Sequence, residues 1–109
     1  MNYVNFEVGN KTYMLRLNTK NTVALEKVLG GNPLCIFDTN GETLPPVATL
    51  AAVLHASLQQ YQPNTSLNDA YNIFDDYLAE HSVESFIYVV LDIYRVSGLI
   101  PKEVDNEKN

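Results

Sequence analysis

The hydrophobic and polar positions of residues 2–17 alternate in a way that predicts a β-hairpin. The two alternating runs are separated by Gly9-Asn10, a dipeptide that tolerates the positive φ of two-residue turns. A turn at this point places Phe6 opposite Tyr13 and Val8 opposite Lys11. This register gathers apolar side chains on one face: Val4, Phe6, Val8, Tyr13, Leu15 and Leu17. An isolated hairpin is marginal in water, so we expect this face to pack against the rest of the chain.

The remainder of the chain carries the start and stop signals of about four helices. The first helix starts at Asn18 or Thr19, both of which are good helix caps. It stops at Gly30-Gly31, because glycine permits the left-handed conformation of a helix end. Residues 32–41 then form a short apolar turn or a single helical turn that closes at Asn40-Gly41.

The second helix starts at Pro46, because proline suits the first helical position, and it stops before Pro63. Its apolar positions form a main stripe: Val47, Leu50, Ala51, Leu54, Leu58 and Tyr61. The opposite side carries Ala48, Ala52 and Ala56. These small residues either admit a second close neighbour or simply favour the helix.

Serine caps mark the starts of the last two helices. Ser66 precedes Asp69 in a variant of the capping box, and Ser82 precedes a helix that ends at Gly98. On the third helix the apolar and polar residues occupy complementary arcs, as they do on the surface helix of a globular protein.

These elements predict a mainly α (α+β) fold, in which an N-terminal β-hairpin packs on a compact bundle of about four helices. One domain covers residues 1–100, with the hairpin in 2–17 and the helical part in 19–97. The polar residues 101–109 are expected to be a disordered tail.

The chain has 109 residues and a net charge of −6, and its cations are unevenly distributed. No Lys or Arg lies between Lys27 and Arg95. Nucleic acids and anionic membrane surfaces are bound by clustered cations, so this distribution argues against both as partners. No apolar run approaches the roughly 20 residues that span a bilayer, and the N-terminus lacks the features of a secretory signal. Together with the lone cysteine, Cys35, these features indicate a cytoplasmic protein, and any charged partner is expected to be basic.

The stretch "IFDDYLAEH" at residues 73–81 holds residue types that bind metals and transfer protons. On a helix, however, Asp75, Asp76 and Glu80 face away from the apolar arc. No aspartate-rich loop supplies the further oxygens that a bound cation needs. We interpret these three residues as an exposed acidic ridge, which either serves solubility or contacts a basic partner. His81 is expected at the junction between the last two helices.

Other catalytic arrangements find no support in the sequence. Cys35 lies among apolar neighbours and is interpreted as a small buried hydrophobe. His55 is interpreted as a half-buried histidine bonded to a carbonyl. The glycines of "VLGGNP" at residues 28–33 are explained by the helix end, and the stretch is too short for a phosphate loop. We therefore predict no enzymatic activity, no metal site and no cofactor.

The last predicted helix is apolar around most of its circumference, and its polar arc is narrow: Glu84, Ser85, Tyr88, Asp92 and Arg95. Such a helix is either central to its domain or shared with a partner. One apolar flank is our candidate face for self-association or partner binding: Phe86, Val89, Ile93 and Val96. The alternative is a central helix that contacts both the hairpin and the second helix. Both interpretations are compatible with the sequence.

Four stretches resemble the tail assembly chaperones of long-tailed (siphovirus-type) bacteriophages or prophages of Gram-positive bacteria. They are "YMLRLNTKNTVALEKVLGGNPLCIF", "VLHASLQQYQP", "LNDAYNIFDDYLAE" and "IYRVSGLIP". In this order they cover most of residues 13–101. They are signatures of fold and packing, and none of them is a catalytic motif.

The resemblance implies a non-enzymatic protein that acts in the cytoplasm of the bacterial host and is absent from the mature virion. Such chaperones bind the tape measure protein, keep it soluble and help to recruit the tail tube protein. We therefore expect a homo-oligomer with these two proteins as partners. A tape measure protein is largely helical, so the expected recognition surface is a groove or stripe that holds amphipathic helices.

Three other functions are kept as alternatives. One is a minor structural or connector protein of the phage virion. Another is a small metal-dependent enzyme that uses Asp75, Asp76, Glu80 and a histidine. The third, a small transcriptional regulator, is disfavoured by the charge distribution.

Overall fold

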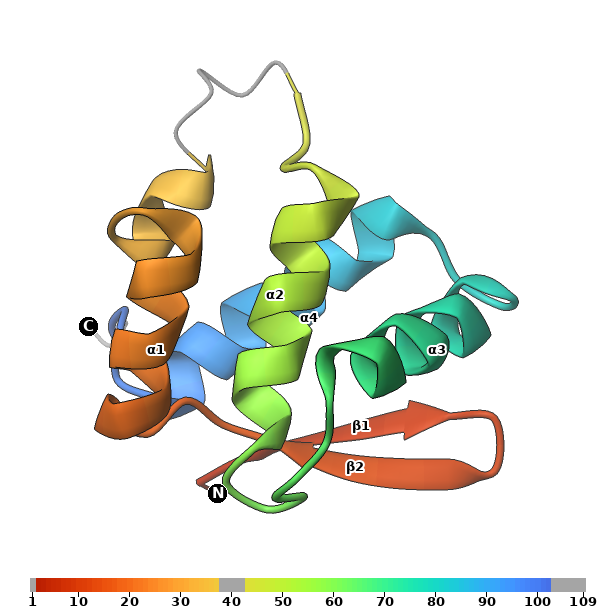
Figure 1. The fold of residues 1–109 in the computed structure, drawn as a ribbon. Coiled ribbons are helices and arrows are strands. Elements are labelled where there is room, and N and C mark those ends of the chain that lie inside the picture. Colours follow the sequence, from red (N-terminus) through yellow and green to blue (C-terminus); the bar gives the residue numbers. More distant parts are fainter. Residues whose placement is uncertain (1, 38–42, 103–109) are drawn as a thin grey trace, which may run out of the picture.

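The computed structural model describes residues 2–37 and 43–102. The elements in chain order are β1 (Val4–Val8), β2 (Lys11–Leu15), α1 (Thr19–Leu29), the short 3-10 helix η1 (Pro33–Phe37), α2 (Val47–Leu58), α3 (Leu67–Leu78) and α4 (Val83–Val96) (Figure 1). They confirm the α+β prediction of an N-terminal hairpin followed by about four helices. The expected turn at Asn40-Gly41 and residues 103–109 of the expected tail lie outside the described residues.

The hairpin has the predicted register. Phe6 lies opposite Tyr13 and Val8 lies opposite Lys11, and the chain turns at Gly9 with a φ of 61°. Glycine adopts this conformation without steric cost, and a positive φ at the first central position matches a type II′ turn. The predicted apolar face is confirmed, because it buries Phe6, Val8, Leu15 and Leu17 and half-buries Val4 and Tyr13.

The helix ends follow the capping residues. Asn18 caps α1, because its side chain accepts a hydrogen bond of 2.9 Å from the backbone N–H of Asn21. Gly30 ends α1 in the left-handed conformation, with a φ of 77°. At the start of α3, Ser66 and Asp69 form the two reciprocal hydrogen bonds of a capping box, each 3.0 Å long. The predicted caps of these helices are therefore confirmed.

One helix start differs from the prediction by one residue. Pro46 was expected as the first helical residue, but its backbone is extended, with a ψ of 151°, and α2 begins at Val47. The carbonyl of Pro46 accepts the first helical hydrogen bond, from the N–H of Leu50 at 3.1 Å, which makes Pro46 the N-cap. The predicted stripe of α2 is buried at Leu50, Leu54 and Leu58, while Val47 at the helix start is exposed.

Helix α4 is the central element of the fold. It runs behind α2 in Figure 1 and packs against both α2 and β1. The side chain of Phe86 meets those of Phe6, Phe74 and Tyr77, with ring centroids 5.8, 4.8 and 5.4 Å away. These aromatic contacts connect β1, α3 and α4 in one core. The sequence-based alternative of a central helix that contacts the hairpin and the second helix is therefore confirmed.

The outer edge of β2 forms hydrogen bonds with a side chain from the turn after α2 in place of a neighbouring strand. Gln62 accepts a hydrogen bond from the backbone N–H of Met14 at 2.8 Å and donates one to the Met14 carbonyl at 2.9 Å. Nearby, the Arg16 N–H donates to the Ser57 carbonyl at 2.9 Å. Backbone groups at an open strand edge need partners, and these contacts supply them.

Tyr94 connects α4 to η1. It is fully buried, and its hydroxyl donates a hydrogen bond of 2.9 Å to the carbonyl of Pro33. Burial raises the pKa of Tyr94 above its ordinary value, because a charged phenolate is poorly solvated in the core. The neutral phenol is therefore the form that the folded protein holds.

Replacing Tyr94 with phenylalanine is expected to lower the free energy of unfolding by about 1 to 2 kcal/mol, because the buried Pro33 carbonyl loses its donor. A second effect appears at alkaline pH. The unfolded chain releases the Tyr94 proton above a pH of about 10, while the folded chain still holds it, so the stability from this group is full below that pH and falls as the pH rises further. The variant should lack this part of the alkaline decline. Urea denaturation at neutral and alkaline pH measures both effects, and equal stability of the two proteins at neutral pH would contradict the prediction.

Candidate functional site

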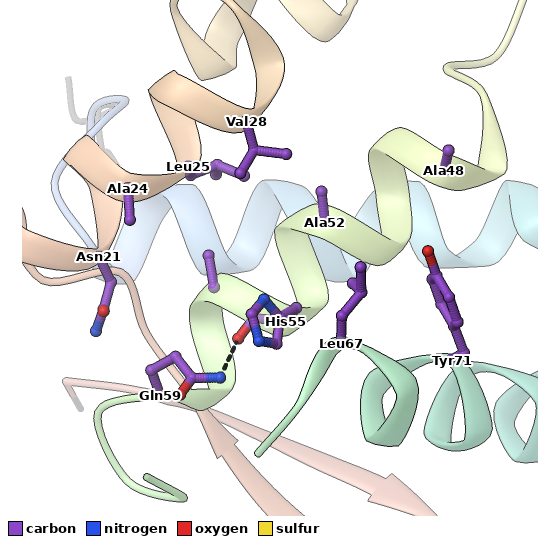
Figure 2. A pocket seen from close by; sticks show the side chains of 11 residues that line it. Asn21, Ala24, Leu25, Val28, Ala48, Ala52, His55, Gln59, Leu67 and Tyr71 are labelled. Carbon is purple, nitrogen blue, oxygen red and sulfur yellow. Dashed lines mark hydrogen bonds between the residues drawn. The ribbon is translucent and has the colours of Figure 1, made fainter. Parts of the chain in front are cut away.

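An open groove of about 370 Å³ lies on the face formed by α1, α2 and the start of α3 (Figure 2). Ala24 and Val28 of α1 form one wall, and Leu67 and Tyr71 of α3 form the other. We call this feature the α1–α3 groove. Its volume is comparable to that of other binding clefts, which fall in a range of about 300 to 1,000 Å³.

The floor of the groove is the alanine side of α2. Ala48, Ala52 and Ala56 line it at four-residue spacing and so lie in one row along the helix. The nine residues from Ala48 to Ala56 span a length of about 12 Å along the helix axis. A floor of methyl groups leaves space between the two walls that larger side chains would fill. Of the two interpretations of these alanines, the structure therefore supports room for a close neighbour.

The walls expose more apolar surface than isolated surface residues would. Val28 is 71% exposed, Tyr71 is 48% exposed and Leu67 is 41% exposed. Leu67 and Tyr71 belong to the apolar arc predicted for α3, but they lie at its edge, beyond the residues that α3 buries. Exposed apolar side chains gathered around a concave surface are typical of a binding site for protein or ligand.

The polar side chains at one end of the groove, His55 and Gln59, are already hydrogen-bonded to backbone carbonyls of the same chain. The Nε2 atom of His55 lies 3.1 Å from the carbonyl oxygen of Thr65. The side-chain amide of Gln59 donates hydrogen bonds to the carbonyls of His55 and Thr65, at 2.9 and 2.8 Å. His55 is half-buried, so the prediction of a carbonyl-bonded histidine is confirmed. The groove therefore offers mainly apolar contacts.

Cys35 differs from its prediction. It was expected to be buried, but it is exposed on η1. The 3-10 helix instead buries Pro33, whose carbonyl is bonded to Tyr94, and its geometry turns Cys35 outward. Cys35 and His55 line different cavities, so the structure does not bring them together.

The acidic ridge lies where the sequence predicts it. Asp75 and Asp76 are exposed on α3, and Glu80 is exposed in the turn that follows the helix. Within residues 2–37 and 43–102, no three His, Cys, Asp or Glu side chains are grouped so that they could hold a metal ion. His81 follows α3 at the junction with α4, and its ring stacks on that of Tyr77 with centroids 4.6 Å apart.

The candidate contact flank of α4 needs correction. Phe86 and Ile93 are fully buried, and Val89 and Val96 are half-buried. The hairpin and α3 cover Phe86, as the contacts of its ring with those of Phe6 and Phe74 show. A contact role for Phe86 and Ile93 therefore conflicts with their burial in the folded monomer.

Comparisons with protein-family models, with curated proteins and with solved structures gave no match. In the part of the chain that the structure describes, no helix has the length and the apolar character needed to cross a membrane. The geometry of the groove and the resemblance of the four sequence stretches are therefore the basis for a functional proposal.

Proposed function

We propose that this protein is a tail assembly chaperone of a long-tailed bacteriophage or prophage, and that it binds helical segments of the tape measure protein. The observation that carries the proposal is the α1–α3 groove, an exposed apolar depression bounded by helices. An amphipathic helix buries its apolar face in a groove of this kind. A long helical protein that has not yet been enclosed by its tube exposes such faces along its length.

The charge of the chain supports the same function. The net charge of −6 disfavours non-specific aggregation of a protein that exposes apolar surface. The acidic ridge of Asp75, Asp76 and Glu80 adds a surface that attracts basic segments of a partner. A soluble, acidic protein with an apolar groove has the properties that a chaperone for a helical client needs.

The rest of the proposal follows from the resemblance. The chaperone acts in the cytoplasm of the bacterial host, assembles as a homo-oligomer along the tape measure protein and helps to recruit the tail tube protein. It leaves before the tail is complete, so the mature virion lacks it. No cofactor or enzymatic step is part of this function.

Co-expression with fragments of the tape measure protein from the same phage or prophage tests the proposal. We expect the chain to increase the soluble fraction of the fragments and to be recovered with them on an affinity resin, because it covers their apolar faces. A variant in which the groove is intact but an exposed residue elsewhere is changed, Tyr88→Ser, serves as the matched control and should behave like the natural chain.

Two outcomes would contradict the proposal. The first is that correctly folded protein neither binds nor solubilises any tape measure fragment. The second is that mass spectrometry finds the chain as a regular component of purified virions, which would favour the alternative of a minor structural or connector protein.

A further inference from the structure

We propose that the α1–α3 groove selects the helix that it binds by the charges along both edges of that helix. The preferred occupant is an amphipathic helix with acidic residues along the edge that meets α1 and basic residues along the edge that meets α3. This inference rests on the proposed function only in that the partner is taken to be a protein helix. It adds the chemistry by which this chain selects one helical segment over another.

The shape of the groove favours a single helix over a second copy of this chain. The floor from Ala48 to Ala56 is about 12 Å long, which matches two turns of a helix with a pitch of about 5.4 Å. A helix can therefore place three apolar anchors, at i, i+3 or i+4, and i+7, between the walls. Two copies that met groove to groove would join two concave surfaces and leave a cavity between them, which costs packing energy.

The edge formed by α1 is basic. Lys20 and Lys27 are exposed, and they lie four residues before and three residues after Ala24, which lines the groove. Residues at these spacings are neighbours on the surface of a helix. Glu26 lies on another side of α1, where it lines a separate depression with Val23. The charges of α1 next to the groove are therefore positive.

The edge formed by α3 carries one negative charge, that of Asp75. Asp75 is exposed and lies four residues after Tyr71, so it continues the wall beyond the ring of Tyr71. Asn68 and Asn72 are the other exposed residues on this side, and both are neutral. A helix in the groove thus meets positive charge along α1 and negative charge along α3.

Three synthetic helical peptides with the same apolar stripe test the inference. One carries Glu along one edge and Lys along the other, the second carries Lys on both edges, and the third carries Glu on both edges. At about 150 mM salt, where long-range attraction is screened, we expect the mixed peptide to bind the natural chain about three- to tenfold more tightly than either of the others. In the double variant Lys20→Glu with Lys27→Glu, the preference should change to the peptide with Lys on both edges.

Two exposed valines of α1 provide a matched pair of variants for the groove itself. Val28 lines the groove and Val23 does not, although both are exposed on the same helix. Val28→Glu places a charge in the apolar wall and should weaken binding of the mixed peptide by at least about tenfold, while Val23→Glu should leave it unchanged. Circular dichroism checks that both variants keep their helical content.

The result that overturns the inference is a natural chain that binds the peptide with Lys on both edges best, or an unchanged preference in the double lysine variant. Equal effects of Val28→Glu and Val23→Glu would also overturn it, as would a groove that binds only a second copy, seen as a dimer that Val28→Glu dissociates. These results are separable from failure of the proposed function. If tape measure fragments still bind to the Val28→Glu variant, the chaperone function stands and the groove is not its site.

Discussion

Replacing Phe86 with alanine is expected to lower the free energy of unfolding by about 3 to 5 kcal/mol, the cost of removing a large buried aromatic side chain. Phe86 is fully buried, and its ring contacts those of Phe6, Phe74 and Tyr77. Its loss leaves a cavity at the point where β1, α3 and α4 meet. The whole stability of a small domain is about 5 to 15 kcal/mol, so this single change removes a large fraction of it. Urea denaturation followed by circular dichroism measures the change.

Tyr88 provides the control on the same helix. It is 68% exposed, so Tyr88→Ala should change the free energy of unfolding by no more than about 0.5 kcal/mol. If Phe86→Ala instead kept full stability and only altered the size of an oligomer in light scattering, Phe86 would be a contact residue and its burial in the core would be wrong.

Replacing Gln62 with alanine is expected to lower the free energy of unfolding by about 2 to 4 kcal/mol, because three hydrogen bonds of this side chain are lost. Two of them join Gln62 to the N–H and carbonyl of Met14, and the third reaches the Leu58 carbonyl at 2.9 Å. The edge of β2 then has unpaired backbone groups in a half-buried place. Hydrogen exchange of the Met14 N–H should become faster, as measured by nuclear magnetic resonance.

The variant Gln62→Glu separates the two kinds of hydrogen bond. A carboxylate can still accept from the Met14 N–H, but it cannot donate to the carbonyls of Met14 and Leu58. This variant should therefore keep the slow exchange of the Met14 N–H better than Gln62→Ala does. If Gln62→Ala left both the free energy of unfolding and the hydrogen exchange of the Met14 N–H unchanged, the prediction would be wrong, because water would then replace the hydrogen bonds of the side chain at no cost in stability.

The parts of the fold that could be predicted from the sequence depend on local chemistry. The register of the hairpin follows from the positive φ that Gly9 permits. The ends of α1 follow from the Asn18 side chain and the left-handed Gly30. Each of these features involves residues within a few positions of one another, so no knowledge of the distant chain is needed. The same is true of the acidic side of α3, because the helical periodicity of the sequence is enough to place Asp75 and Asp76 on the solvent side.

The candidate site could be predicted only in part. The alanine side of α2 was visible in the sequence, but its role depended on which elements stand beside it. The walls come from Val28, which precedes the floor residue Ala48 by 20 positions, and from Tyr71, which follows the floor residue Ala56 by 15 positions. The contact between Gln62 and Met14 spans 48 positions and has no sequence signal at all.

The sequence by itself determined the type and order of the elements, their caps, the hairpin register and the acidic character of the surface, because these depend on backbone conformation and on charge. The tertiary structure decided which apolar faces are covered. A helical wheel shows the direction of a side chain but not the neighbour in that direction. The hairpin and α3 therefore bury Phe86 of α4 in the core. By contrast, α1 and α3 lie on either side of the alanines of α2 and leave the groove between them open.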